Sequence, residues 1–288
     1  MTGNTLGWVI VAFVLYLLMM IAIGAFYAKG NNNSEDYFLG GRKLNGFVAA
    51  LSAQASDMSG WLLMGLPGAI YLTGVGGDGW IAIGLFIGTT LNWLFIATKL
   101  RRYTIRANNS VTLPTYFENR FHDEKKVLMT VSSITIVVFF LVYCASALSA
   151  GGQLFESVFG IDYHVALTIG ALVVLVYTFL GGFTAVCVTD FIQGMLMLVG
   201  ILAVPLFAYH FLTTGGTTLS VGLEASGADS ANFLNLMKNG DGSNNIISVI
   251  SGLGWGLGYF GMPHILVRFM AVRDEKEMTK SKATAISW

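Results

Sequence analysis

A carboxylate inside an otherwise apolar, helix-length stretch is the feature of this sequence with the most obvious chemical potential. Asp57 lies in Ser52-Ala-Gln-Ala-Ser-Asp-Met-Ser-Gly-Trp61, about eleven residues inside an apolar segment that we expect to begin at Gly46. An ionisable group at such a depth in a membrane is costly and therefore points to a functional site. Gly60 and the pair Pro67-Gly68 predict that the helix is interrupted here, which would expose main-chain carbonyls near the carboxylate.

This pattern predicts a cation site, because hard cations such as Na⁺ prefer the oxygen ligands that a carboxylate and an unwound turn supply. We expect Asp57, Ser59 and Gly60 to take part. In the alternative interpretation Asp57 caps the backbone N–H groups of a helix end at the membrane interface, but its depth argues against this. Ser52 and Ser56 are weaker candidates, since a serine in a helix commonly bonds to its own backbone.

The segment Gly252–His264 is rich in glycine and aromatic residues. It contains a formal G-x-G-x-x-G match, which we reject as a dinucleotide motif because no strand–turn–helix context surrounds it. Trp255, Tyr259 and Pro263 follow one another at intervals of four residues and would share one helix face, while Pro263 frees a backbone carbonyl. A pocket for a small solute and ordinary helix packing with an interfacial aromatic belt both remain open from spacing alone.

Three further residues have two interpretations each, and two more have a single one. Tyr143 is either a structural tyrosine or a hydroxyl donor to the same cavity. Asp190 is either an N-terminal helix carboxylate, favoured by the helix dipole, or part of an ion-release path. Arg42 is either a topology charge or a gate at the inner mouth. For His264 and Arg268 we expect anchoring at the membrane interface.

The elements that must position these residues are transmembrane helices. Of the 288 residues 55% are apolar and 11% are charged, and the mean hydropathy is +0.67, whereas soluble domains carry about 25% charge. Spanning the bilayer takes ~20 apolar residues, and no period-2 alternation suggests a barrel. The expected spans are Leu6–Ala28, Gly46–Leu72, Gly79–Leu100, Val127–Gly151, Val165–Phe183, Asp190–Leu212 and Ile246–Val272.

The distribution of basic residues predicts the topology. Of the 16 lysines and arginines, all except Lys238 lie in linker 29–45, in linker 99–126 or in residues 268–282. These regions fall on one side of the membrane if seven helices alternate, so the positive-inside rule places the N-terminus outside and the C-terminal tail in the cytoplasm. The first segment has no basic leader and is expected to be retained. The polar, Gly-rich stretch 213–245 is expected to be a surface loop of low order.

Together these segments resemble the sodium:solute symporter family over nearly the whole chain. The matching motifs are long: Asp36-Tyr-Phe-Leu-Gly-Gly-Arg42, the run from Ala50 to Gly68, Phe139–Ser146, Tyr177–Phe183, Thr189–Gln193 and the run from Trp255 to Phe269. Met262 departs from the glutamine that close members of the family have at this place.

The resemblance implies an all-α integral membrane protein with the LeuT-type inverted-repeat transporter fold. Residues 1–28 would be an extra N-terminal helix, 46–212 the first five-helix repeat and 246–288 the opening of the second, truncated repeat. The family has more helices than the seven expected here, so we expect a fragment that does not transport alone. The hydroxyls that complete the sodium site would then come from a helix beyond residue 288.

The resemblance also implies a function: Na⁺-coupled uptake of a small solute, L-proline, across the plasma membrane by alternating access, with no enzymatic activity and no nucleic-acid partner. Another solute, or a solute sensor on the same fold, is the alternative. An intramembrane aspartyl protease built on Asp57 and Asp190 would need its carboxylates within a few Å. The implied site residues are, for sodium, Ala55, Asp57, Met58, Ser59 and Gly60; for the solute, Ser59, Tyr143, Trp255, Tyr259 and Pro263; and for coupling or gating, Arg42 and Asp190.

Overall fold

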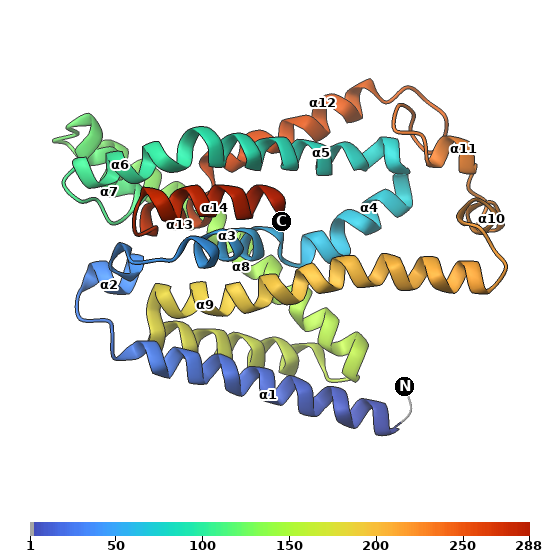
Figure 1. Ribbon diagram of the computed structural model, residues 1–288, viewed down its shortest axis with the longest axis horizontal. Helices are drawn as coiled ribbons and strands as arrows, with labels where there is room; N and C mark the ends of the chain where they lie inside the picture. The colour runs from blue at the N-terminus through green and yellow to red at the C-terminus, as the bar shows by residue number, and fades with distance from the viewer. Residues whose placement is uncertain (1–2) are drawn as a thin grey trace.

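Helices account for all the regular structure of residues 3–288, which are the residues that the computed structural model describes; side chains are described from Gly7 onward, except that of Ser59. Within this range β pairing is limited to two isolated bridges. Helices α1, α5 and α9 lie roughly along the longest axis of the molecule, and α8 crosses behind them obliquely (Figure 1). This arrangement is that of a multi-pass membrane protein.

Each of the seven predicted spans corresponds to helical structure. They are α1 (Gly3–Ala28); α3 (Gly46–Gly60), η2 (Trp61–Gly65) and α4 (Leu66–Thr73); α5 (Val75–Leu91), η3 (Asn92–Ala97) and α6 (Thr98–Arg106); α8 (Val127–Phe159); α9 (Tyr163–Thr214), which holds two spans; and α12 (Ile246–Gly254), η4 (Trp255–Gly261) and α13 (Pro263–Ala271). The remaining elements are α2 (Ser34–Leu39), η1 (Gly40–Arg42), α7 (Leu113–Phe121), α10 (Leu219–Ala225), α11 (Ser230–Phe233) and α14 (Glu275–Ser287).

By length and composition alone, four helices of the described chain could cross a membrane, and a fifth is the pair Ile246–Gly261 and Pro263–Ala271, bent by 46°. The difference from seven has two causes. The second expected span is divided at Gly60, and its apolar part, Trp61–Thr73, is too short to count alone. The fifth and sixth expected spans are joined in α9.

A single glycine separates the two spans of α9. A straight helix of its 52 residues would be ~78 Å long, well beyond a ~30 Å hydrocarbon core. Gly182 has φ 60° and ψ −158°, a conformation open only to glycine, and the chain reverses there (Figure 1). Tyr177 and Gln193, on opposite sides of this break, line the same cavity against α1. The predicted linker 184–189 is therefore helical instead.

The three basic regions meet at one end of the molecule, as the charge pattern predicted. Arg101 donates from Nε to the carbonyl of Val272 at 2.6 Å, and Arg102 pairs with Glu275 at 2.7 Å. Figure 1 shows α2, α6 and α7 at this end and α10 and α11 at the other. A bundle of seven alternating spans explains this separation.

One expectation about the connections was wrong, and one segment has a fold that was not predicted. Residues 275–287 form α14, which packs along α3, and Glu277 Oε2 accepts from the Gly46 N–H at 2.7 Å. The stretch 213–245 contains α10 and α11 and docks onto the α4–α5 turn, where Gly240 donates to the Thr73 carbonyl at 2.9 Å. Composition shows that such segments are polar, but it does not show what accepts their hydrogen bonds.

Helix α3 lies at the centre of the packing because its residues are small. Ala49, Ala50 and Ala53 are at most 1% exposed, and such residues let helix backbones approach closely in a membrane. The same core cluster holds two large, fully buried side chains, Trp93 of η3 and Phe269 of α13. They pack edge-on with ring centroids 4.4 Å apart. This core fixes the elements that carry the candidate site.

Candidate functional site

The helix carrying Asp57 is distorted where the sequence predicted an interruption, but it is not unwound. Helix α3 ends at Gly60 and continues directly into the π-helical turn η2. π-Turns of this kind are rare and are frequent at functional sites. Gly60 itself has φ −65° and ψ −17°, which any residue adopts, so the expectation that it supplies special backbone freedom was wrong. The Met58 carbonyl accepts from the Trp61 N–H at this junction.

The seventh span changes geometry twice. Residues Trp255–Gly261 form the 3₁₀ turn η4, and Pro263 begins α13 at its first position. In a 3₁₀ helix residues four apart do not share a face, so the predicted common face of Trp255, Tyr259 and Pro263 was wrong. Trp255 is 48% exposed and Tyr259 only 2%. The freed carbonyl that the proline predicted belongs to Tyr259, and it accepts from the Asn92 side-chain amide at 2.8 Å.

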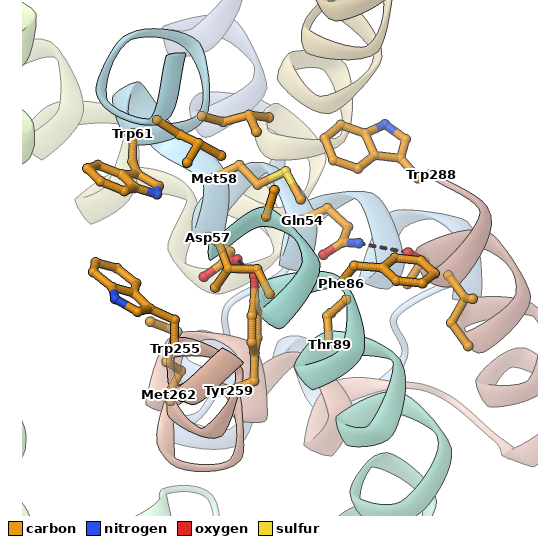
Figure 2. A pocket seen from close by; sticks show the side chains of 18 of the residues that line it. Gln54, Asp57, Met58, Trp61, Phe86, Thr89, Trp255, Tyr259, Met262 and Trp288 are labelled. Atoms are coloured by element: carbon orange, nitrogen blue, oxygen red, sulfur yellow. Dashed lines mark hydrogen bonds between the residues drawn. The ribbon is translucent and has the colours of Figure 1, made fainter. Parts of the chain in front are cut away.

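These two distorted spans enclose a cavity of about 710 Å³. Small-molecule sites usually measure ~300–1,000 Å³. Figure 2 shows Asp57 and Tyr259 meeting at its wall, with Trp61 and Trp255 on one side and Phe86 and Trp288 on the other. The polar and aromatic side chains that line it come from α3, η2, α5, α8, α12, η4 and the C-terminal end of α14; they include Gln54, Asp57, Trp61, Phe86, Thr89, Tyr143, Trp255, Tyr259 and Trp288.

One hydrogen bond orients the Asp57 carboxylate, and a histidine ring lies beside it. The Tyr259 hydroxyl donates to its Oδ2 (Figure 2). Its Oδ1 lies 3.9 Å from Nε2 of His264, and the side chain of Asp57 is 8% exposed. Both ring nitrogens of His264 are buried without a hydrogen-bond partner in the described part of the chain. The prediction that His264 anchors the span at the membrane interface was therefore wrong, because its ring is buried beside the carboxylate.

Aromatic rings shape the rest of the cavity. Trp61 and Trp255 stack with centroids 5.4 Å apart and an interplanar angle of 5°. Tyr143 stacks on His264 at 5.7 Å, and its hydroxyl donates to the Ser56 carbonyl at 3.0 Å. Ser56 precedes Asp57, so Tyr143 braces α3 at the site as well as lining the cavity. A small solute would therefore meet aromatic faces and a single carboxylate.

The structure brings some of the predicted site residues together and leaves others aside. Asp57, Met58, Tyr143, Trp255 and Tyr259 line the cavity. The predicted residues outside its lining are Ala55, Gly60 and Pro263, and Met262 lines it where Pro263 was expected. The Ser59 side chain lies outside the described residues, although its backbone belongs to α3.

Asp190, on α9, lies in a second polar cluster with residues of α3 and α13, and none of these residues lines the cavity. Its Oδ2 accepts from Ser52 Oγ at 2.7 Å, from Ser56 Oγ at 2.9 Å and from Arg268 Nη2 at 2.8 Å. Arg268 is 5% and Asp190 7% exposed. The interpretations of Asp190 as a helix-end carboxylate and of Arg268 as an interface anchor were wrong, because the second span of α9 already begins after Gly182 and the two side chains pair inside the bundle.

Arg42 connects several elements at the basic end of the molecule. It has φ 52°, an unfavourable conformation for a residue with a side chain. Its guanidinium donates to the carbonyls of Met270 at 2.9 Å and Ser110 at 2.8 Å and lies 3.4 Å from the Glu35 carboxylate. The strain is compensated by this set of contacts, which tie η1 to the ends of α6 and α13. A plain topology charge would stay in solvent, whereas Arg42 is 8% exposed.

Gln54, Trp61 and Thr89 are among the lining residues that the sequence did not single out. Gln54 and Trp61 lie three residues before and four residues after Asp57 and thus on its helix face, so their spacing could have identified them. Thr89 gave no comparable signal, because a threonine in an apolar span is common. Its place beside the cavity follows from the packing of α5 against η4.

Comparison with known proteins defines the class to which this fold and site belong. The family model described as "Sodium:solute symporter family" matches residues 37–288. The chain belongs to the sodium:solute symporter family, which consists of transporters and not enzymes. The protease interpretation is thereby excluded, and the carboxylates of Asp57 and Asp190 have separate partners.

Individual relatives are similar over nearly the whole chain. The sodium/proline symporters of Salmonella typhimurium and Haemophilus influenzae are each 45% identical over 279 residues, which is 97% of this chain and 54% of each relative. That of Escherichia coli is 44% identical over the same lengths. The chain thus spans about half the length of the curated relatives it matches.

A solved structure confirms the fold. A Na⁺-coupled sialic acid symporter in a substrate-bound outward-open state matches with a TM-score of 0.75 at 20% identity, over 94% of this chain and 56% of its own. The predicted LeuT-type transporter architecture is confirmed by this similarity. The match to part of that chain agrees with the coverage of the sequence relatives.

Proposed function

We propose that this chain forms the ion- and solute-binding part of a symporter that couples Na⁺ entry to uptake of L-proline. The observation that carries the proposal is the buried Asp57 carboxylate on the wall of the cavity, oriented by the Tyr259 hydroxyl. A carboxylate at this depth needs a positive partner, which a transported cation supplies. Relatives at 44–45% identity are named sodium/proline symporters.

The sodium ion would bind against the end of α3. Asp57 contributes the charge, and the carbonyls of Ala55 and Met58 contribute neutral oxygen ligands, with Ser59 and Gly60 beside them. The junction with η2 favours this role, since a π-turn shifts the hydrogen-bonding pattern of the carbonyls that precede it. Na⁺ is a transported substrate here, and it leaves the site in each cycle.

Proline suits the rest of the cavity. Its ring is compact and apolar and its nitrogen is cationic, and tryptophan faces attract both apolar groups and cations. The stacked Trp61 and Trp255 would bound the ring, and Tyr143 and Tyr259 would contact its polar groups. Pro263 would act indirectly, by breaking the span at the cavity. Met262 supplies a flexible apolar side chain at the wall, so another small amino acid is the competing substrate.

The remaining assignments concern the cycle. We propose that residues 46–212 are the first repeat, that 246–288 open the second, and that the basic end faces the cytoplasm with the N-terminus outside. Arg42 and the Asp190–Arg268 pair would close the inner path, because both tie α13 to other elements at or toward that end. Breaking these ties is then a condition for release inward.

Replacement of Asp57 tests the proposal. A chimera in which this chain replaces the matching part of the Salmonella typhimurium symporter would be reconstituted into proteoliposomes, and Na⁺-stimulated uptake of labelled proline measured. D57N should reduce the Na⁺ stimulation at least tenfold, which corresponds to about 1.4 kcal/mol. D78N is the matched control, because that carboxylate lies in the first turn of α5 outside the cavity lining. Unchanged Na⁺ dependence in D57N would contradict the proposal.

Solute identity is tested on the same chimera. Uptake would be competed with unlabelled proline, other small amino acids, pantothenate and sugars. Proline should compete best. Stronger competition by another solute would assign the cavity to that solute while leaving the sodium site intact.

A further inference from the structure

The side chain of Asn92 reaches from the third span to the break in the seventh. It is fully buried and begins the π-turn η3. Its Nδ2 donates to the main-chain carbonyl of Tyr259 at 2.8 Å. No other side-chain donor to that carbonyl occurs in the described part of the chain.

The carbonyl needs this donor because of Pro263. In a continuous α-helix the carbonyl of residue 259 would accept from the N–H of residue 263, and proline has none. A buried carbonyl left without its partner costs free energy. The Asn92 amide therefore replaces the missing hydrogen bond at the point where the span bends by 46°.

The packing of the two spans makes this reach possible. A Cβ added at Gly84 or Gly88 would collide with the carbonyls of Gly252 or Gly256, so the backbones are in direct contact. Asn92 follows Gly88 by four residues and lies on the same face of the span. On the far side of the bend, Trp93 packs against Phe269 of α13 with ring centroids 4.4 Å apart. Adjacent residues of η3 thus hold both arms of the bend.

We infer that Asn92 is a positioning residue of the transport site: it fixes the Tyr259 backbone, and through it the hydroxyl that donates to Asp57. The inference deepens the proposed function, because the geometry it fixes is that of the sodium-linked carboxylate. Loss of the amide lets η4 shift, and the Tyr259 hydroxyl then no longer meets Asp57.

A double-mutant cycle between Asn92 and Pro263 tests the inference. P263A restores a backbone N–H at the position that can donate to the Tyr259 carbonyl. N92L should therefore lower the melting temperature of the detergent-solubilised chain by several degrees with Pro263 present and by clearly less in the P263A background. N92A removes the same donor without adding bulk. It replaces N92L in the double-mutant cycle if N92L cannot be purified in folded form.

N245L is the matched control. Asn245 is also a buried asparagine whose amide donates to backbone carbonyls, those of Gly76 and Leu236 at 2.9 and 2.8 Å. Asn245 is distant in sequence from the bend before Pro263. N245L should therefore lower the melting temperature equally with proline or alanine at position 263. An equal cost of N92L in both backgrounds would overturn the inference and assign Asn92 to packing alone.

A kinetic arm uses the chimera described above. N92L should raise the apparent KM for Na⁺ about tenfold, the loss expected from one buried hydrogen bond, with a smaller change in Vmax per transporter. An unchanged KM with reduced Vmax would contradict a positioning role. The stability cycle needs neither Na⁺ nor proline, so it decides the inference even where the transport assay refutes the proposed function.

Discussion

The buried pair of Arg268 and Asp190 provides the sharpest test of how this bundle is held together. Their charged atoms are 2.8 Å apart and their side chains are 6% and 10% exposed. At an effective dielectric constant of about 20 the attraction is about 6 kcal/mol. Much of this offsets the cost of removing both charges from water, and losing one partner of such a pair costs about 3–5 kcal/mol because the other charge remains buried.

We therefore expect R268M to destabilise the chain strongly. On the scale of domains of 150–250 residues, about 3–5 kcal/mol lowers the melting temperature by roughly 6–20 °C. Arg268 Nε also donates to Ser52 Oγ at 2.9 Å, and this loss adds to the effect. Thermal unfolding of the purified chain in detergent, followed by tryptophan fluorescence, measures the shift.

The double variant separates charge from packing. R268M/D190N removes both charges, so it should melt higher than R268M alone. R102M is the matched control, because Arg102 pairs with Glu275 at 2.7 Å but both side chains are more than half exposed, and such pairs contribute about 0–1 kcal/mol. The reasoning fails if R268M and R102M shift the melting temperature equally, or if the double variant is as unstable as the sum of the single ones.

Two further predictions concern close packing and pH. G88A should lower the melting temperature by several degrees because its Cβ would meet the Gly256 backbone, whereas G261A should not, since nothing lies within 4 Å of that Cβ; equal shifts in thermal unfolding would contradict this. Hydrogen bonds from Lys280 and from the Gly46 N–H hold the pKa of the Glu277 carboxyl below its ordinary value of 4.5. A carboxyl whose pKa is depressed in the folded state stabilises that state at pH values above the unfolded-state pKa. This stabilisation is lost as the pH falls through the folded-state pKa. The melting temperature of the wild type should thus fall more steeply than that of E277Q below about pH 4.5, and parallel pH profiles would exclude the contribution.

The sequence predicted the helices and the Asp57 site because both depend on local composition. Apolar runs of membrane length need no partner to identify them, and a carboxylate within one is informative wherever the helix packs. The basic linkers 29–45 and 99–126 were placed at one end by a count that is independent of tertiary structure. The helical spans and the common end of the basic linkers are confirmed by the structure, whereas the role of Asp57 stays a prediction.

The wrong predictions concern which side chains share a helix face, or which residues contact one another across the fold. The 3₁₀ turn at Trp255 and the π-turn at Trp61 rotate the side chains that follow, and hydrophobicity in an all-apolar span does not report this rotation. Arg268 and Asp190 are 78 residues apart in the chain, so each alone resembled an interface residue. Gly182 reverses the chain within a continuous helical pattern, and its φ is visible only in the fold.

The polar clusters around Asp57 and Asp190 are connected through adjacent residues of α3. Ser56 donates to Asp190, and Asp57 accepts from Tyr259. On the seventh span, the His264 ring lies beside Asp57 while its carbonyl accepts from Arg268, which pairs with Asp190. A movement of α13 along α3 by one helical turn, about 5.4 Å, would therefore separate His264 from Asp57 and Arg268 from both serines, Ser52 and Ser56, at once. Under the proposed function, occupation of the Asp57 site and closure of the Asp190 cluster would be linked through α13, as coupled transport requires of two sites.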